Sequence, residues 1–151
     1  MPSFQRKGFL DLYGGKAGVA KSLSQRFGVW TFTFDFDRGE EQNLLSRELQ
    51  QKIFKMMRAG CFLGVGAAPE CCSFSRAVVP PVRSALQPEG IGVMSEKMAT
   101  GNAHAQFVLA VLLLAEELQL AWWCENFDGS YTWMLGDFVA AGIVFSWEFQ
   151  V

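Results

Sequence analysis

The sequence has few of the residues that build metal centres and disulfide frameworks. Its 151 residues include one histidine, His104, and four cysteines, which are Cys61, Cys71, Cys72 and Cys124. No two cysteines form a C-x-x-C pair, and His104 lies far from them in sequence, so we expect no metal site. Because no export signal is visible, we expect the cysteines to be free thiols in a reducing compartment.

Long hydrophobic runs and an excess of one charge are also absent. The longest apolar run, "FVLAVLLLA", is shorter than the roughly 18 residues of a membrane span and is typical of a core helix. The N-terminal stretch "MPSFQRKGFLDLYGG" lacks a long apolar segment and a cleavage site. We therefore predict an intracellular protein, nuclear or cytoplasmic, with no membrane partner. The net charge of −2 excludes a general polyanion binder that works by bulk charge, while a local basic edge stays possible.

What is present favours one globular domain over residues 1–151. The length is sufficient for a single core. Half of the residues are apolar and 14% are aromatic, which argues against disorder. No internal repeat or low-complexity segment interrupts the chain.

Short apolar runs alternate with helical patterns along the chain. We predict strands at 8–13, 29–35, 61–67, 119–126 and 140–151, helices at 17–28, 43–60 and 102–118, and a proline-rich loop at 69–94. This alternation predicts an α/β fold, a Rossmann-like three-layer sandwich with a mainly parallel sheet. Ligands of such folds bind beyond the carboxyl ends of the strands, so the residues after each strand are the candidate site.

The first predicted strand leads into a glycine-rich turn. Gly15 to Ser22 reads "GKAGVAKS", which approaches the phosphate-binding pattern G-x-x-x-x-G-K-[ST] but has Ala20 in place of the second glycine. Asp11 also brings negative charge toward the would-be phosphates. A nucleoside triphosphate is therefore disfavoured. The alternatives are a loop for S-adenosylmethionine or a dinucleotide, and a plain strand–turn–helix.

The second predicted strand ends in an acid and an aromatic residue. Asp35 stands 20 residues after Gly15, where nucleotide-binding α/β domains place the acid that binds ribose hydroxyls. A carboxylate suits this role because it accepts two hydrogen bonds from vicinal hydroxyls. The alternative is an exposed acid at a strand end. Phe36 either stacks on an adenine or packs in the core.

A pair of adjacent cysteines follows the third predicted strand. In "AAPECCSFSRA" Cys71 and Cys72 cannot both face the core, so at least one thiol should project into the loop's surroundings. A nucleophilic thiol needs a lowered pKa, which Arg76 or Arg83 could favour and Glu70 would oppose. The alternative is that the cysteines are small apolar fillers.

The fourth predicted strand also ends in an acid. Glu125 follows the apolar run "LAWWC", so we expect partial desolvation and a raised pKa, which would suit a proton donor. The alternative is a salt-bridged acid or a cap on the next turn.

Taken together, these four elements resemble the DNA cytosine-5 methyltransferases. The family's D-L-F-x-G-x-G-G is matched by "DLYGGKAG" at 11–18, and its acid–aromatic pair by Asp35 and Phe36. Its G-G-P-P-C-Q-x-F-S loop is matched by "AAPECCSFS" at 67–75, and its E-N-V motif by Glu125 and Asn126. The order and approximate spacing agree over about residues 8–130.

The resemblance implies an S-adenosylmethionine-dependent transfer of a methyl group to carbon 5 of cytosine in DNA, with the target base flipped out of the duplex. It implies that Cys71 is the nucleophile at carbon 6, that Glu125 protonates ring nitrogen 3, and that Asn126 holds the loop backbone. The cofactor-binding residues that it implies are Asp11, Gly15 and Gly18 at the methionine end, Asp35 at the ribose, Phe36 at the adenine, and Pro69 in the shaped loop.

The chain departs from the family pattern at several points. Ala17 replaces a glycine, Glu70 replaces the second proline, and Phe127 replaces the valine. No Q-x-R-x-R segment follows Asn126, so we expect a domain without the target-recognition and C-terminal parts, which binds DNA weakly on its own. Two alternatives stay open: a catalytically inactive Rossmann-like module that binds a ligand or partner, and a hydrolase that uses Cys71 with His104.

Overall fold

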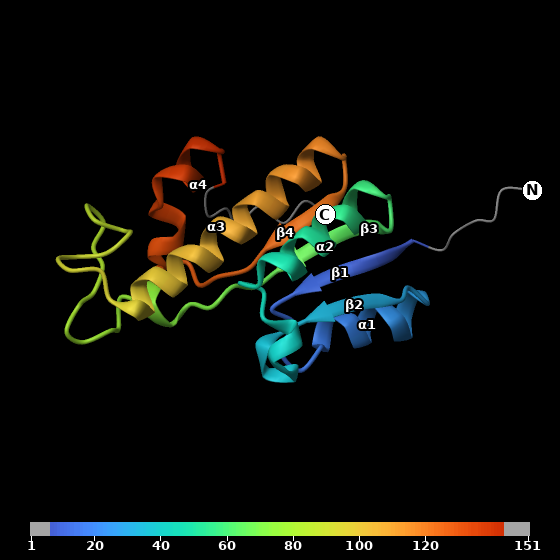
Figure 1. Cartoon of the computed structure of the whole chain (residues 1–151), viewed down its shortest axis with the longest axis horizontal. Coiled ribbons are helices and arrows are strands. Elements are labelled where there is room, and N and C mark those ends of the chain that lie inside the picture. Colours follow the sequence, from blue (N-terminus) through green and yellow to red (C-terminus); the bar gives the residue numbers. More distant parts are fainter. Residues whose placement is uncertain (1–6, 144–151) are drawn as a thin grey trace, which may run out of the picture. The chain divides into compact units, whose positions relative to one another are not determined.

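The computed structural model of the chain describes residues 7–143 (Figure 1). The chain divides into two compact units, and each is described by itself. The first unit contains the residues up to Pro69 together with Gln106–Glu125, and the second contains Glu70–Ala105 together with the residues from Asn126 on. The expected single domain over 1–151 stays a prediction.

The first unit contains all four strands of the described residues. Its elements are β1 (Gly8–Leu12), α1 (Gly18–Phe27), β2 (Thr31–Phe34), the 3-10 turns η1 (Phe36–Arg38) and η2 (Glu40–Gln42), α2 (Arg47–Arg58), β3 (Phe62–Ala67), the end of α3 (Glu96–Glu117) and β4 (Ala121–Cys124). The strands form one sheet in the order β2-β1-β3-β4. Every pairing in it is parallel.

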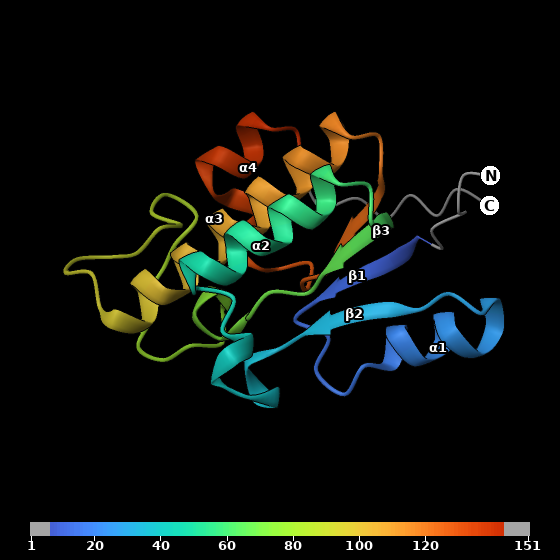
Figure 2. The ribbon, with the colours of Figure 1, turned by 45° about the vertical axis from the view of Figure 1, so that its right-hand side comes forward.

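This topology confirms the predicted α/β fold with helices on both faces of a parallel sheet. Because β2 and β3 lie on opposite sides of β1, right-handed crossovers place α1 on one face of the sheet and α2 on the other. Figures 1 and 2 show α1 on the face opposite to α2. The unit is therefore layered as helix, sheet and helices.

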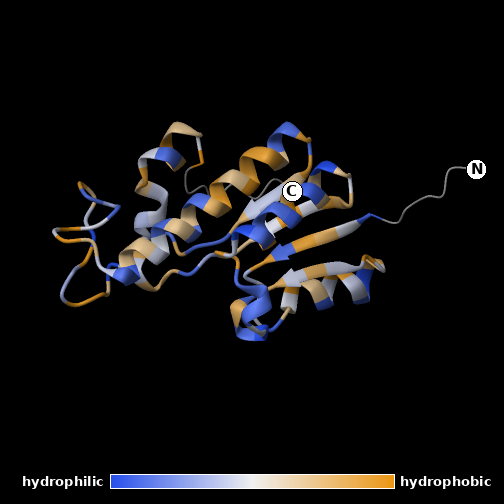
Figure 3. Ribbon diagram, viewed as in Figure 1, coloured by the Kyte–Doolittle hydropathy of each residue, from blue (hydrophilic) through white to orange (hydrophobic). Residues whose placement is uncertain are grey.

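The sheet is held mainly by its buried central strands. Leu10, Leu12 and Val65 are fully buried, and every residue of β1 is buried. Figure 3 shows β1 and β3 as largely hydrophobic ribbons. A parallel sheet covered on both faces needs such continuous apolar strands, because neither side of the strand meets water.

Helix α2 exists as predicted, but it begins at Arg47, four residues after the predicted start at 43. Ser46 caps its start by accepting a hydrogen bond from the backbone N–H of Leu49. Leu49, Ile53 and Met57 are buried at intervals of four residues, which places them on one face. The helix ends before Gly60, whose φ of 74° favours glycine.

Helix α1 exists as predicted, but its buried face is different. The spacing of Val19, Leu23 and Phe27 predicts an inward stripe, yet Ala20 is the buried residue of this helix. Val19 is exposed, and Phe27 is 72% exposed. The helix thus buries a small side chain, while Leu23 is half-buried and Val19 and Phe27 are exposed.

An aromatic side chain of β4 covers a part of β3 that has no side chains of its own. A side chain at Gly64 or Gly66 would collide with β4, at Gly66 with the Trp123 ring itself. The Trp123 ring also stacks on Phe9, with 4.7 Å between the ring centroids. Two glycines in β3 therefore make room for a stacked pair of rings.

The second unit is built from short elements around a small core. It contains η3 (Cys72–Phe74), the start of α3, η4 (Tyr131–Met134) and α4 (Gly136–Ala140). Phe74, Met98 and Phe138 are buried. The segment between η3 and α3 is irregular, as its three prolines favour.

Two predicted boundaries at the C-terminal half change. Helix α3 begins at Glu96, six residues before the predicted start at 102, because the Ser95 side chain accepts from Met98 N–H and starts the helix there. The strand predicted at 140–151 begins within α4, which ends at Ala140. Residues 144–151 of that strand lie outside the described residues.

Among the described residues, α3 is one helix with the length and composition of a membrane span, and 56% of its most apolar window is buried in the protein. A buried core helix passes the same test, so this feature does not assign α3 to a membrane.

Candidate functional site

The carboxyl ends of the four strands form one edge of the sheet in the first unit. Backbone hydrogen bonds continue the ladder just past the strands, from Tyr13 N to Phe34 O at 2.8 Å, from Ala68 N to Leu12 O at 3.1 Å and from Glu125 N to Ala67 O at 2.8 Å. Neighbouring strands lie about 4.8 Å apart, so the ends of β2 and β4 are about 14 Å apart along this edge. Ligands of parallel α/β sheets bind at such an edge.

Asp35 links the end of β2 to the glycine turn. Its Oδ2 accepts a hydrogen bond from Gly15 N–H at 2.8 Å, and its Oδ1 accepts from Asp37 N–H at 3.0 Å. Arg38 reaches the same turn and donates to the Gly15 carbonyl at 3.2 Å. A carboxylate has about four acceptor positions, so Asp35 keeps two for a ligand.

Asp11 is a buried acid with an unpaired oxygen. The residue is 5% exposed, and its Oδ2 has no hydrogen-bond partner. Burial raises the pKa of the Asp11 carboxyl, Arg38 lowers it, and Asp35 raises it again. Thr33 donates a hydrogen bond to this carboxylate, which also lowers its pKa.

In the turn after β1, two glycines have free space where a side chain would be, and a third has none. A Cβ added at Gly15 or Gly18 would meet no atom within 4 Å. At Gly14 it would collide with Thr33 and with the unpaired Oδ2 of Asp11. The turn can therefore receive a ligand above Gly15 and Gly18, while Gly14 must remain glycine to cover Asp11.

Ala17 is the first departure from the family motif that has a structural consequence. It precedes α1 in the left-handed conformation, with φ of 58° and ψ of 39°. Side chains make this conformation unfavourable, whereas glycine adopts it freely. The glycine that the family motif has here would fit the observed backbone better than alanine does.

The remaining predicted residues of the first unit differ in exposure. Phe36 is 58% exposed, so the interpretation as a core residue is wrong. Pro69 is buried just after β3. Glu125 is exposed at the end of β4, so the partial desolvation expected for its carboxyl is absent.

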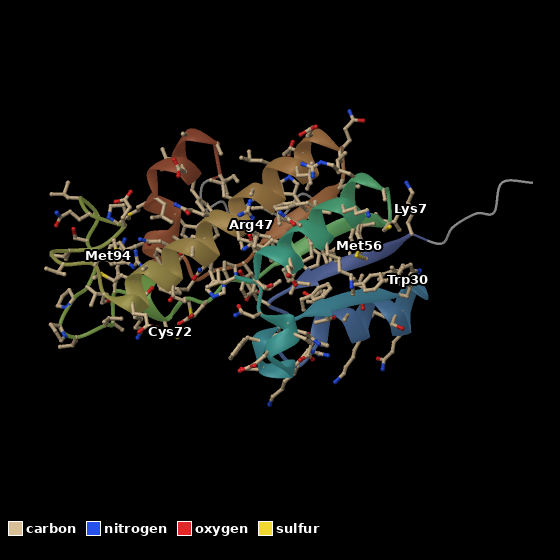
Figure 4. The ribbon with its side chains drawn as sticks, in the orientation of Figure 1. Lys7, Trp30, Arg47, Met56, Cys72 and Met94 are labelled. Atoms are coloured by element: carbon tan, nitrogen blue, oxygen red, sulfur yellow. The ribbon has the colours of Figure 1, made fainter. Side chains whose placement is uncertain are left out.

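The cysteine pair lies in the second unit. Both Cys71 and Cys72 are exposed free thiols, which confirms that at least one projects outward. Partial desolvation of the sulfur is the largest cause that raises the pKa of the exposed Cys72 thiol. Glu70 raises this pKa further by charge repulsion and a hydrogen bond, while Lys97 lowers it. Figure 4 shows Cys72 in the segment that follows β3. Neither cysteine acts as a core filler.

The Asn126 side chain makes hydrogen bonds within the loop that follows β4. Its Nδ2 donates to Thr132 Oγ1 at 3.3 Å, and its Oδ1 accepts from Phe127 N–H at 3.0 Å. Ser130 Oγ donates to the same Thr132 oxygen at 3.0 Å. These bonds brace residues 126–132, so the amide of Asn126 stabilises the loop after β4.

His104 lies on α3 within the second unit and is half-buried. Burial lowers the pKa of its imidazole, and the nearby Glu70 raises it. Glu70 thus affects the pKa values of both Cys72 and His104. The hydrolase alternative, which uses Cys71 with His104, stays a hypothesis.

Sequence reasoning missed two residues of these sites and the burial of a third. Arg38 has no motif of its own, and only its bond to Gly15 reveals it. Gly14 matters because of the close approach of Asp11. Arg83 is one of the two arginines that could favour a thiolate, but it is 1% exposed and its guanidinium contacts neutral acceptors. An arginine in a proline-rich segment carries no sequence signal for burial.

Within residues 7–143, no group of three or more His, Cys, Asp or Glu side chains is arranged to hold a metal ion. Comparison of the chain with models of protein families, with curated proteins and with solved structures finds no match.

Proposed function

We propose that this chain is an S-adenosylmethionine-dependent methyltransferase domain of the DNA cytosine-5 type. The proposal combines the ordered motifs of the sequence with the chemistry at the carboxyl edge of the sheet. Its substrate would be a cytosine extruded from DNA. The bound cofactor would supply an electrophilic methyl group.

The unpaired oxygen of Asp11 is the observation that carries the proposal. A buried acceptor without a donor costs about 1–3 kcal/mol, and more when it is charged. An ammonium group, such as that on the amino-acid end of S-adenosylmethionine, could offset this cost directly or through a water. The turn that follows β1 is open at Gly15 and Gly18, where an added Cβ would meet no atom.

Asp35 and Phe36 would hold the nucleoside end of the cofactor. The two acceptor positions that Asp35 keeps suit the vicinal hydroxyls of a ribose. The exposed Phe36 ring follows directly in sequence, and an exposed ring is available for stacking on an adenine.

The reacting groups on the base would come from Cys71 and Glu125. The Cys71 sulfur, as a thiolate, would form a bond to carbon 6 of cytosine, and the Glu125 carboxylic acid would give its proton to ring nitrogen 3. Both side chains are exposed, so solvent and substrate can reach them. Asn126 would keep the loop after Glu125 in place through its bond to Thr132.

A thermal-unfolding experiment with S-adenosylmethionine tests the cofactor part. A ligand selective for the folded state at 100 times its Kd stabilises by about 2.7 kcal/mol. Asp35→Ala should abolish the resulting rise in Tm, and Asp37→Ala, which removes an exposed acid two residues away, should keep it. No rise for the unmodified chain would refute the proposal.

A trapping experiment tests the chemistry. DNA that contains 5-fluorocytosine should form a covalent adduct with the unmodified chain and with Cys72→Ser, but not with Cys71→Ser. A rise in Tm without any adduct would favour the second candidate, a catalytically inactive Rossmann-like module that binds a ligand. An adduct that survives Cys71→Ser would show that the nucleophile is assigned wrongly.

A further inference from the structure

Arg83 lies at the centre of the second unit. The residue is 1% exposed, although arginine is rarely buried without a charged partner. Its guanidinium donates six hydrogen bonds, which go to Ser73 O at 3.0 Å, Ser73 Oγ at 3.0 Å, Met98 O at 3.1 Å, Pro88 O at 2.7 Å, Glu89 O at 2.9 Å and Asn102 Oδ1 at 2.7 Å. Because Nη1 is shared among three acceptors, the six bonds use all five N–H donors of the arginine.

The acceptors of Arg83 are all neutral. They are backbone carbonyls, a hydroxyl and an amide, with no carboxylate among them. Burial consequently lowers the pKa of Arg83, and the charge of the nearby Glu89 offsets part of this effect. A cation held this way does not neutralise a partner charge. It positions the surrounding chain instead, because each hydrogen bond holds one acceptor group in place.

Two of these points lie in the cysteine loop. Arg83 binds Ser73 at both its carbonyl and its hydroxyl, and Ser73 follows Cys72 directly. The guanidinium also lies over the Phe74 ring, 3.7 Å from its centroid. Phe74 N–H in turn donates to the Cys71 carbonyl at 3.0 Å. Arg83 is thus linked to the backbone of both thiol residues.

The opposite end of the network is helix α3. Met98 and Asn102 accept from Arg83 on its first turns. Gly101 lies between them, and a Cβ there would come within 3.1 Å of Arg83 Nη2 and 3.2 Å of the Phe74 ring, and would collide with the Ser73 hydroxyl. The helix surface is therefore shaped to admit the network.

We infer that Arg83 is a positioning residue for the thiol pair, which ties the Cys71–Phe74 turn to the start of α3 so that Cys71 is held free and Cys72 is held beside Glu70. This inference rests on the proposed function for the use of Cys71 as a nucleophile. The contacts of Arg83 with the Cys71–Phe74 turn and with α3 form without cofactor or DNA.

The test is the alkylation of each cysteine by iodoacetamide across a range of pH, followed by mass spectrometry of the two positions. In the unmodified chain Cys71 should react faster than Cys72 at neutral pH, because partial desolvation and Glu70 raise the pKa of Cys72. In Arg83→Met the rate ratio should approach one, and the pH midpoint of Cys72 should fall toward that of an ordinary thiol.

Two further variants separate geometry from charge and from folding. Arg83→Lys keeps the charge but has three donors instead of five, so it should also lose the difference between the cysteines. Gly101→Ala keeps Arg83 and displaces the Ser73 hydroxyl, so it should reduce the difference in alkylation rate between Cys71 and Cys72. If circular dichroism shows that Arg83→Met is unfolded, Gly101→Ala serves as the test in its place. Arg76→Met, which removes an exposed arginine of the same unit, is the control. It should leave the rate ratio of the two cysteines and the pH midpoint of Cys72 unchanged.

An unchanged rate ratio and Cys72 profile in folded Arg83→Met and in Gly101→Ala would overturn the inference. Full rescue by Arg83→Lys would also overturn it, because charge alone would then suffice. If the ratio collapses as expected while the unmodified chain forms no adduct with 5-fluorocytosine DNA, Arg83 positions the turn and the proposed function fails.

Discussion

Replacing Asp11 by asparagine should stabilise the unliganded protein near neutral pH. The carboxylate is 5% exposed, and one of its oxygens has no partner. An unpaired buried acceptor costs about 1–3 kcal/mol, and more when it is charged. Asparagine keeps the shape and leaves one neutral polar atom unpaired, so we expect a gain of about 1 kcal/mol, or a rise in Tm of about 2–4 °C.

The gain should depend on pH in a defined direction. Burial raises the pKa of Asp11 above its ordinary value of 3.8, so protonation favours the folded state. That stabilisation is fully present below the ordinary pKa and is lost as the pH rises through the pKa of the folded state. The asparagine of the variant does not titrate, so the advantage of Asp11→Asn should be small below pH 3.8 and should grow as the pH rises through the raised pKa of Asp11 in the folded state.

Urea unfolding of the two proteins at several pH values measures this difference. Asp37→Asn removes an exposed carboxylate from the same region and is the control for a general change of net charge. An Asp11→Asn protein that is less stable near neutral pH, or a gain that does not vary with pH, would refute the reasoning. The same variant should weaken the rise in Tm with S-adenosylmethionine, because it removes the charge that attracts the ammonium group.

Two further predictions concern backbone positions. Ala17→Gly should stabilise the protein by about 0.5–1 kcal/mol in urea unfolding, because the relief of a left-handed alanine exceeds the added entropy of the unfolded chain; a loss of stability would show that the turn is not strained. Gly66→Ala should destabilise by about 1–3 kcal/mol and shift tryptophan emission, because its Cβ would collide with Trp123. Gly18→Ala, which meets open space, is its matched control, and an equal loss in both variants would refute the assigned contact.

The sequence was sufficient to predict the sheet and most helices, because these depend on local patterns. The run "FLDL" is buried on both faces, and the four-residue spacing of Leu49, Ile53 and Met57 places these buried side chains on one face of α2. The face of α1 was predicted wrongly, since the pattern of Val19 and Phe27 cannot reveal that the small Ala20 is the buried residue of this helix.

The candidate site was predictable only in part. Strand ends place Asp11, Asp35 and Glu125 at one edge, as the parallel topology requires. The bond from Gly15 to Asp35 and the burial of Arg83 depend on how loops fold back, which no periodicity encodes. The exposure of Glu125 likewise depends on what surrounds the strand end and not on the strand itself.

The glycines of β3 also bear on how the sheet is completed during synthesis. Gly64 and Gly66 leave the strand without side chains on one face, and the cover over them arrives with Trp123 on β4, nearly sixty residues later in the chain. A nascent chain that has not yet reached β4 therefore presents an uncovered backbone strip beside Phe9. Such a strip is a place where two unfinished chains can pair, so this part of the sheet is protected from self-association only when β4 docks.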